Sequence, residues 1–411
     1  MRKGIQKLRR RVLIVSGVVP ALTRGGGCLA LHRHFCERQD FAVAVASYTT
    51  AGTSCADVLQ IPRTDWWLRV KRTRLCRLAE NLDYLAAASR LPRALVRYAK
   101  DWKPDLIFSV ADDIHAPIAH RLARTLRIPF AVNFQDLFAC SSFVPRPCRP
   151  LPGVKSLLTS RYRKLQAKAD AVFHTSDGMK EWFGMAARGD VLYPIGAATE
   201  IEPEPRPSPK GTLTLAYAGN CYGAYGAQVL SLARELDGAA KVTLQVFTMG
   251  NDWPAKDVQH YTRTGVYRGY LPFSALRDEL EKADAFITTM SFAREDRVFV
   301  ETSFTTKWLD YAPLGKPIVV WGPEYSSAAR FARAKPTGLV VEDFKPASVI
   351  AAIERLRADH VEWTRLSLGA MDVAKNELNA ERLHNLLKTR LLELVSVGMP
   401  PRRSPNRYLA V

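Results

Sequence analysis

Short apolar runs alternate with stretches of helical spacing along most of the chain. In the first half the apolar runs are RVLIVSG, FAVAVASY, DLIFSVA, FAVNFQD and AVFHTS, rich in Val, Ile and Phe and bounded by turn residues. Between them lie helical stretches: HRHFCERQ, residues 66–100, IAHRLARTLR and SRYRKLQAKA. Continuous apolar strands separated by helices are typical of a parallel sheet covered on both faces.

The same alternation restarts after a proline-rich segment. EIEPEPRPSPKG, over residues 200–211, has no apolar periodicity and predicts a linker. LTLAYAGN, KVTLQVFTMG, AFITTM, PIVVWGP and GLVVED then alternate with helices. Residues 346–396 show apolar spacing of three and four, which predicts helix. The tail PPRRSPNRYLAV is expected to be disordered.

The pattern therefore predicts an α/β protein made of two Rossmann-like, doubly wound domains. We place them at residues 1–200 and 212–396, joined by the linker 201–211 and followed by the tail 397–411. Open α/β sheets bind ligands at the carboxyl ends of their strands. Two such domains facing each other would bind their substrates in the cleft between them.

Composition and charge narrow the class of protein. No apolar run approaches the roughly 20 residues that a membrane-spanning helix needs. The seven cysteines are odd in number and form no CxxC pair, which favours reduced thiols in a cytoplasm over a disulfide framework or a zinc site. The net charge is +19, and residues 1–100 hold 19 Lys and Arg against 6 Asp and Glu. This asymmetry suggests that the first domain faces an anionic partner.

Two segments of this basic region allow alternative interpretations. The start, up to Cys28, resembles a signal peptide, but Ser16, Gly17 and Arg24 interrupt its pattern, and a first strand at Val12–Ser16 followed by a helix near Gly27 is favoured. The second segment interleaves an apolar set with a basic set. It fits a helix lying on an anionic membrane, although packing on its own domain with solvated arginines is favoured. The apolar set is Trp66, Trp67, Leu68, Val70, Leu75 and Leu78, and the basic set is Arg69, Lys71, Arg72, Arg74 and Arg77.

The glycines Gly25, Gly26 and Gly27 follow the first predicted strand. They suit either a tight turn or close approach of the backbone to a phosphate or sugar. The pattern is not GxGxxG, and the second strand does not end in the acid that would bind a ribose, so a nicotinamide cofactor is disfavoured. The chain also has no GxxxxGK[ST] loop, which excludes a P-loop NTPase.

The segment SFTTKWLDYAPLGKPIVVWGP, residues 303–323, is the sharpest local feature. Helical spacing from Thr305 places Trp308, Tyr311 and Ala312 on one face, and Gly315 ends the helix. Free N–H groups and hydroxyls at the helix start are suited to bind phosphate. Asp310 lies further along, within reach of a vicinal diol. A capped surface helix is the structural alternative.

This segment resembles the donor-binding helix of family 4-type glycosyltransferases, in particular the subgroup pattern P-[ST]-K-x-x-E-Y-x-x-x-G-K-P. LAYAGNCYG, YRGYLPFSALRDELEKADAFITT, KPDLIFSVADDIHAPIAHRLARTLRIPFAVNFQDLF and AKADAVFHTSDGMKEWF resemble further motifs of the family, in the family's order. The resemblance implies the GT-B fold, transfer of a sugar from a nucleoside diphosphate sugar with retention at the anomeric carbon, and no required metal or other cofactor. It places Asp310 on the nucleotide ribose.

The sequence also departs from the family. Thr302 stands where the family has the first of two acids eight residues apart, with Glu301 one position off. No Arg or Lys follows the first strand of the second domain between Gly219 and Gln228. The missing cation would have to come from Lys307, Arg294 or Arg297, since Lys and Arg bind phosphate. Asn220 would either bind a phosphate or cap a turn.

The site predicted from these observations has two halves. The donor half comprises Gly219, Asn220, Arg294, Ser303, Thr305, Thr306, Lys307 and Asp310. The acceptor half comprises Gly25, Gly26, Gly27, Asp112, His115 and Asp136, with Asp136 and His115 as the catalytic or acceptor-positioning candidates. Asp112 and Asp113 have an alternative role as caps of the following helix, and His115 as a capping or surface histidine.

We therefore expect a cytoplasmic glycosyltransferase, peripheral to the inner face of a membrane if the basic region binds lipid. Its partners would be a nucleotide sugar and a hydroxyl of a glycan or lipid-linked acceptor. The missing acid and loop cation leave open a catalytically degenerate scaffold of the same fold. The basic charge raises nucleic-acid binding as a further alternative, but the chain contains no recognised nucleic-acid motif.

Overall fold

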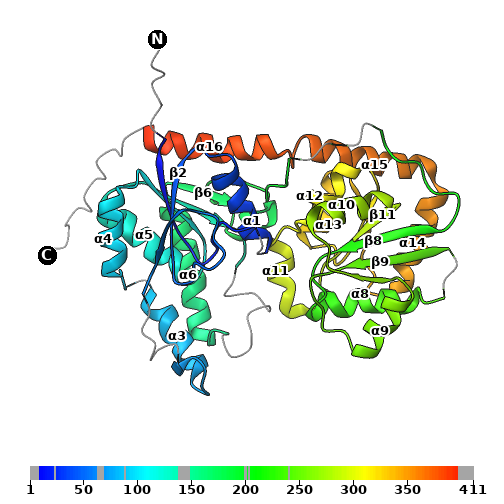
Figure 1. Ribbon diagram of the computed structural model, residues 1–411, viewed down its shortest axis with the longest axis horizontal. Coiled ribbons are helices and arrows are strands. Elements are labelled where there is room, and N and C mark those ends of the chain that lie inside the picture. Colours follow the sequence, from blue (N-terminus) through cyan, green and yellow to red (C-terminus); the bar gives the residue numbers. More distant parts are fainter. Residues whose placement is uncertain are drawn as a thin grey trace, which may run out of the picture.

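Two parallel sheets, each covered by helices on both faces, form the protein (Figure 1). The computed structural model describes residues 9–22, 25–62, 69–87, 89–137, 149–198, 201, 204–238 and 241–396. The predicted tail 397–411, and Trp66, Trp67 and Leu68 of the predicted amphipathic segment, lie outside these residues.

The first domain has a seven-stranded sheet of order β3-β2-β1-β4-β5-β6-β7, and every pair is parallel. The five predicted strands of this half are all present, and short strands at each edge, β3 and β7, were not predicted. The strands are β1 (Arg11–Val15), β2 (Ala42–Ser47), β3 (Asp57–Gln60), β4 (Leu106–Val110), β5 (Phe130–Phe134), β6 (Ala171–His174) and β7 (Asp190–Val191).

Alternate residues of the first sheet face two separate cores. Leu13 and Val15 point to one core and Val12 and Ile14 to the other, as the two-residue period of a strand requires. The helices of this domain are α1 (Gly26–His32), the π-helical turn η1 (Arg33–Glu37), α3 (Cys76–Ala87), α4 (Arg93–Trp102), α5 (His115–Leu126), α6 (Pro152–Lys168) and α7 (Asp177–Trp182).

The second domain repeats this plan with a parallel six-stranded sheet of order β10-β9-β8-β11-β12-β13. Its five predicted strands are present, and β10 is additional. The strands are β8 (Leu213–Ala218), β9 (Val242–Phe247), β10 (Tyr267–Gly269), β11 (Ala285–Thr289), β12 (Ile318–Trp321) and β13 (Gly338–Val341).

The helices of the second half follow these strands along the chain. They are α8 (Gly223–Glu235), α9 (Ala255–Arg263), α10 (Phe273–Lys282), the 3-10 turn η4 (Arg294–Asp296), α11 (Arg297–Thr302), α12 (Lys307–Tyr311), the 3-10 turn η5 (Ala312–Leu314), α13 (Ser327–Ala334), α14 (Pro346–Ala358), α15 (His360–Lys375) and α16 (Ala380–Ser396). Gly315 ends η5 with φ 59°, as predicted for the end of this helical segment.

The last helix returns to the first domain. α14 and α15 pack on the second sheet through Ile353 and Trp363. α16 instead extends over the first domain (Figure 1), where Leu383, Leu387 and Leu391 join the core that contains Ile14. The two domains are therefore joined twice by the chain, once through the linker and once at the start of α16.

A direct contact between α7 and α11 also joins the domains. Ser176 donates a hydrogen bond of 2.5 Å to the carbonyl of Thr302, and Arg330 of the neighbouring helix α13 pairs with Glu181 of α7. Gly178 lies so close to α11 that a Cβ at this position would be 1.9 Å from the carbonyl oxygen of Glu301. Only a glycine allows the two backbones this approach.

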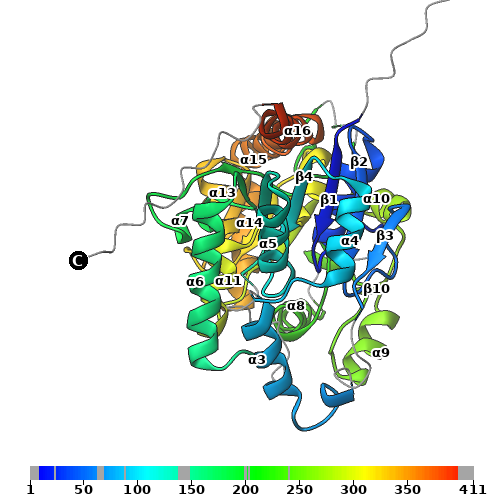
Figure 2. The ribbon, with the colours of Figure 1, turned by 90° about the vertical axis from the view of Figure 1, so that its left-hand side faces the viewer.

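The helix α3 departs from the favoured interpretation of the basic segment. That interpretation packs the apolar face on its own domain, but Leu75 and Leu78 are 58% and 54% exposed. α3 lies at the lower end of the first domain (Figure 2), beside the start of α6. Among the described residues, none of the helices combines the length and the hydropathy that a membrane-spanning helix needs.

We predict that Gly178→Ala loosens the contact between the domains. The added methyl meets backbone, which cannot rotate away as a side chain does, so α7 and α11 must separate. Overpacking of this kind costs about 1–3 kcal/mol, and we expect a lower melting temperature by differential scanning calorimetry. Gly153→Ala is the matched control because nothing lies within 4 Å of its Cβ position. Equal melting temperatures for the two variants would contradict the contact.

Candidate functional site

The loop after β8 and the start of α12 bring two predicted donor residues together. Gly219 has φ 154°, and a Cβ there would lie 2.6 Å from Cε and 2.9 Å from Nζ of Lys307. The Lys307 ammonium lies 4.9 Å from the centroid of the Tyr217 ring. An ammonium group, that of Lys307, therefore lies at the end of this strand, where the sequence itself has no Arg or Lys.

Two tyrosines that were not predicted as site residues, Tyr217 and Tyr311, hold this arrangement. The backbone N–H of Ala218 donates to the Tyr311 hydroxyl at 2.7 Å, which ties α12 to the end of β8. The Tyr217 hydroxyl donates to the carbonyl of Asn220 at 2.8 Å and fixes the turn. Tyr311 also stacks on Phe286, with ring centroids 4.5 Å apart. The available signal for Tyr311 was its match to the tyrosine of the family pattern.

Charges of opposite sign meet across the domain interface at α12. Burial lowers the pKa of Lys307 to about 8, although Cys221 and Asp310 act in the opposite direction. Burial raises the pKa of Asp310 to about 6, although Arg33 and Lys307 act in the opposite direction. Arg33, on η1 of the first domain, also donates to the carbonyl of Ile195 at 2.8 Å. No local pattern in the sequence points to Arg33, because the contact is between domains.

The remaining predicted donor residues do not all lie at the start of α12. Thr306 immediately precedes α12 but makes no capping hydrogen bond through its side chain, and the hydroxyl of Thr305 lies 3.3 Å from that of Thr288. Ser303 does not offer a free N–H as expected, because its N–H donates to the Phe299 carbonyl at the end of α11. Arg294 lies exposed on η4, and Asn220 is exposed at the turn after β8.

Arg297, the other candidate cation, and Glu301 and Thr302, at and beside the position of the family's first acid, all bind other groups of the protein. Arg297 pairs with Glu301 at 2.8 Å and lies 4.7 Å from the centroid of the Tyr325 ring. Thr302, at the position of the family's first acid, is buried and donates to the Val298 carbonyl at 2.7 Å. Among these cations, Lys307 is the one placed against Gly219.

The glycines after β1 meet the donor segment from the opposite domain. A Cβ at Gly26 would lie 3.0 Å from Cγ2 of Thr306, and one at Gly27 would lie 2.4 Å from Oε1 of Gln135. Gly25 precedes α1. Gly26, Gly27, Asp136 and Thr306 line a cavity of about 70 Å³ between the domains. The structure thus brings together predicted residues from both halves of the site, and burial raises the pKa of Asp136 to about 6.

Asp112 and His115 have structural partners that account for their polar atoms. Asp112 accepts backbone N–H groups of Gly17 at 2.9 Å, Ile114 at 3.0 Å and Ala116 at 3.2 Å, which confirms the helix-capping alternative. Burial would raise the pKa of Asp112, but His115 and these N–H groups outweigh it and lower the pKa.

His115 joins the loops after two strands. Its Nδ1 lies 2.8 Å from Oδ2 of Asp112, and its Nε2 accepts the Tyr48 N–H at 3.3 Å. The Nε2 lone pair therefore accepts the Tyr48 N–H, and the Nδ1–H group donates a hydrogen bond to Asp112. In this arrangement His115 orients the cleft loops and does not present a free nitrogen to a substrate.

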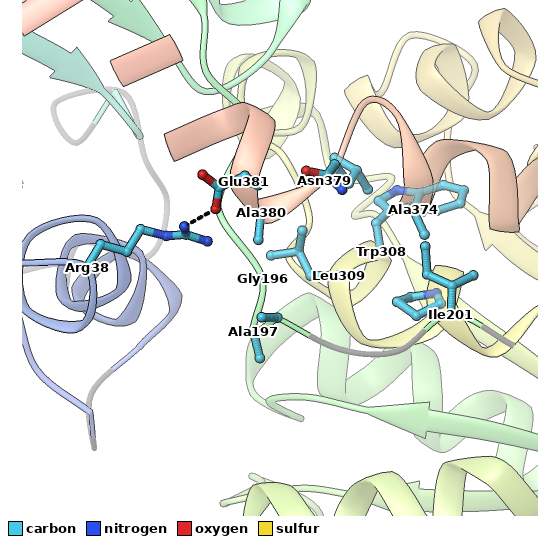
Figure 3. A pocket seen from close by; sticks show the side chains of 13 residues that line it. Arg38, Gly196, Ala197, Ile201, Trp308, Leu309, Ala374, Asn379, Ala380 and Glu381 are labelled. Carbon is cyan, nitrogen blue, oxygen red and sulfur yellow. Dashed lines mark hydrogen bonds and ion pairs between the residues drawn. The ribbon is translucent and has the colours of Figure 1, made fainter. Parts of the chain in front are cut away.

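A larger pocket of about 360 Å³ lies on the other side of α12, where both chain connections between the domains pass (Figure 3). Trp308 and Leu309 of α12, Gly196 and Asn379 line it, and an ion pair between Arg38 and Glu381 spans its edge. It contains none of the predicted site residues. Its position at both connections makes it a hinge region that a change in domain angle would reshape.

Comparison with known proteins identifies the fold. Residues 28–190 match the family model of the glycosyl transferase 4-like domain. The chain resembles the structure of HepE from Anabaena in complex with UDP and glucose, with 14% identity, a TM-score of 0.61, and coverage of 93% of this chain and 99% of HepE. No match was found among curated protein sequences.

Two further structures show the same likeness. Sucrose-phosphate synthase from Thermosynechococcus elongatus has 12% identity, a TM-score of 0.61, and coverage of 95% of this chain and 100% of the synthase. α,α-Trehalose 6-phosphate synthase from Burkholderia multivorans has 13% identity, a TM-score of 0.58, and coverage of 97% and 100%. The prediction of the GT-B fold, with a glycosyl transferase 4-like first domain, is confirmed.

We predict that Tyr311→Phe destabilises the second domain. Removing the hydroxyl leaves the buried N–H of Ala218 without its acceptor, at a cost of about 1–3 kcal/mol. Urea unfolding followed by tryptophan fluorescence, which reports on the buried Trp308 and Trp321, measures the change. Tyr270→Phe, at a side chain that is 61% exposed, is the control. An unchanged midpoint for Tyr311→Phe would show that the hydroxyl does not tie α12 to β8.

Proposed function

We propose that this chain, a GT-B protein with a glycosyl transferase 4-like first domain, transfers a sugar from a UDP-sugar to a hydroxyl of a glycan or lipid-linked acceptor. The observation that carries the proposal is the Lys307 ammonium held against the backbone of Gly219 at the carboxyl end of β8. A cation and a glycine turn together suit a diphosphate, because the backbone approaches it closely while Lys supplies a point charge. UDP is the proposed nucleotide because the similar HepE structure contains UDP.

In this proposal the donor lies along α12. The diphosphate lies between Gly219, Asn220 and Lys307, with Thr305 and Thr306 beside it, and Asp310 binds the ribose hydroxyls. Arg33 and Lys307 keep part of the Asp310 population ionised despite its burial, and an ionised carboxylate is the better acceptor for two hydroxyls. Arg294 and Ser303 remain candidates of the donor half. Lys307 also stabilises the charge that develops on the departing UDP.

The acceptor lies on the first-domain side of the cleft. Gly26 and Gly27 leave room beside Thr306, and Asp136 accepts a hydrogen bond from the attacking hydroxyl. His115 is a positioning residue, since it holds Asp112 and the loop after β2 in place. Following the family 4-type resemblance, transfer proceeds with retention at the anomeric carbon. Closure of the domains excludes water, so the sugar passes to the acceptor.

The cysteine states support a reducing compartment for this reaction. Cys36, Cys55 and Cys221 carry free thiols, and the Cys36 and Cys55 sulfur atoms lie 3.3 Å apart in a hydrogen bond rather than a disulfide. Free thiols are the usual state in a cytoplasm, so we propose a cytoplasmic enzyme. The supply of a cation by Lys307 favours catalysis over the alternative of a degenerate scaffold.

We predict that one nucleotide class stabilises the protein. A panel of UDP-, GDP-, ADP-, dTDP- and CMP-sugars is compared by thermal unfolding. A ligand at 100 times its dissociation constant stabilises by about 2.7 kcal/mol, and we expect this shift with UDP-sugars. Asp310→Ala should lose most of the shift, whereas Asp372→Ala, at an exposed position on α15, should keep it. A shift with another nucleotide class, or with none, would contradict the proposed donor.

We predict that donor affinity depends on pH at both ends of the neutral range. Below about pH 6 Asp310 gains a proton and no longer accepts from both ribose hydroxyls. Above about pH 8 the free enzyme's Lys307 loses its charge. Affinity for a UDP-sugar, whose diphosphate diester does not titrate in this range, should therefore fall in both directions.

Isothermal titration calorimetry from acid to alkaline pH measures this profile. Asp310→Asn should flatten the acid limb without removing the alkaline one. Lys307→Arg should flatten the alkaline limb, because an Arg guanidinium keeps its charge. A flat wild-type profile, or limbs that survive the matching variant, would show that these two groups do not bind the donor.

A further inference from the structure

An exposed leucine stripe runs along α3 on the outside of the first domain. Leu75, which immediately precedes α3, and Leu78, Leu82 and Leu85 within it are 58%, 54%, 45% and 43% exposed. Their spacing of three, four and three residues places them on one side of the helix. The opposite side, including Tyr84 and Ala87, is buried. α3 therefore has two apolar faces, of which the domain uses one.

The start of α6 extends this stripe. The backbone N–H of Leu151 donates to Oδ1 of Asn81 at 2.9 Å, which places Leu151 beside α3. The Leu151 side chain is 41% exposed. We call the surface formed by Leu75, Leu78, Leu82, Leu85 and Leu151 the leucine face. A contiguous apolar patch of this kind on a soluble surface marks an interaction site more often than scattered single leucines do.

Exposed arginines flank the leucine face. Arg69, Arg72, Arg74 and Arg77 are all exposed on the segment that leads into α3 or on its first turn. The two acids of the same stretch are neutralised locally by two cations, since Lys71 pairs with Glu80 at 2.9 Å and with Asp83 at 2.6 Å, and Arg90 lies 3.8 Å from Asp83. The leucine face therefore has an arginine border whose positive charge is not balanced by these acids.

We propose that the leucine face docks on the surface of an anionic lipid bilayer. An apolar helix face with a basic border matches the boundary between acyl chains and acidic headgroups. A second copy of the chain fits less well, because pairing two such faces would bring two sets of arginines together. A nucleic acid would match the arginines but would leave the leucines in water.

The position of α3 connects this surface to the acceptor side of the cleft. α3 packs on both α5 and α6. α5 begins at His115, and the Tyr162 hydroxyl of α6 donates to Oδ1 of Asp113 at 2.7 Å. Asp113 follows Asp112 at the cleft. Resting on the proposed function, this placement means that the acceptor is carried on the bilayer surface, with its hydroxyl presented to the first domain.

Vesicle co-sedimentation of the full chain tests the docking. Vesicles of phosphatidylcholine alone are compared with vesicles of equal parts phosphatidylcholine and phosphatidylglycerol. We expect binding to the mixed vesicles and little binding to phosphatidylcholine. Arg74→Glu/Arg77→Glu should weaken binding by about 25-fold or more, since each basic residue contributes about fivefold. Leu78→Ser/Leu82→Ser should weaken it by at least about tenfold.

Controls use matched positions on the second domain. Leu368→Ser, at a side chain that is 50% exposed, and Arg263→Glu, at an exposed position of α9, should bind vesicles as wild type does. UDP-sugar stabilisation should be unchanged in all variants, which shows that they are folded. It also separates the two claims: failure of UDP binding would overturn the proposed function while leaving the vesicle result to judge the docking.

Three results would overturn the docking proposal. The first is no binding of the wild type to mixed vesicles. The second is loss of binding in the arginine variant but not in the leucine variant, which would indicate adsorption by charge alone. The third is a wild-type dimer that Leu78→Ser/Leu82→Ser converts to a monomer in size-exclusion chromatography with light scattering, which would make the leucine face an interface between copies.

Discussion

The contact between the Lys307 ammonium and the Gly219 backbone is the interaction on which the candidate site depends. It exists because Tyr311 binds the end of β8 through the Ala218 N–H, and because the residue after that strand is a glycine. A side chain at Gly219 would occupy the space of the Lys307 side chain. Burial of the ammonium, with its lowered pKa, leaves a charge that a diphosphate would stabilise. The shape, the charge and the proposed chemistry of the site therefore all depend on this contact.

Contacts between the two domains hold them in an arrangement that places this site in the cleft between them. Ser176 and Gly178 of the first domain meet α11 immediately before the donor segment, and Gly26 meets Thr306 within it. α16 crosses back onto the first sheet, so the second domain is anchored at two points. A change of angle between the domains would alter the gap beside Thr306 and, in the same motion, reshape the hinge pocket, the larger pocket lined by Trp308 and Asn379. This provides a physical route for closure on a substrate.

The sequence predicted the parts of the fold that depend on local pattern. Both doubly wound domains and all ten named strands followed from apolar runs such as those around Leu13 and Val319. The edge strands β3 and β10 are short and partly exposed, so their apolar signal was weak. The apolar spacing of α16 predicted a helix but could not say which sheet it covers. Lys307 was one of several candidate cations, and only the spatial contact distinguishes it from Arg294 and Arg297. Arg33 and Tyr217 contribute through contacts that no local pattern encodes.

The most direct test of the account is a crystal structure of the full chain with UDP bound. The account predicts a diphosphate within hydrogen-bonding distance of Lys307 Nζ and the backbone at Gly219, with the ribose hydroxyls at the Asp310 carboxylate. UDP bound elsewhere, for example in the hinge pocket lined by Trp308 and Asn379, would contradict it. A diphosphate placed in the cleft but held by Arg294 or Arg297, with Lys307 turned away, would also contradict the central role given to the contact between Lys307 and Gly219.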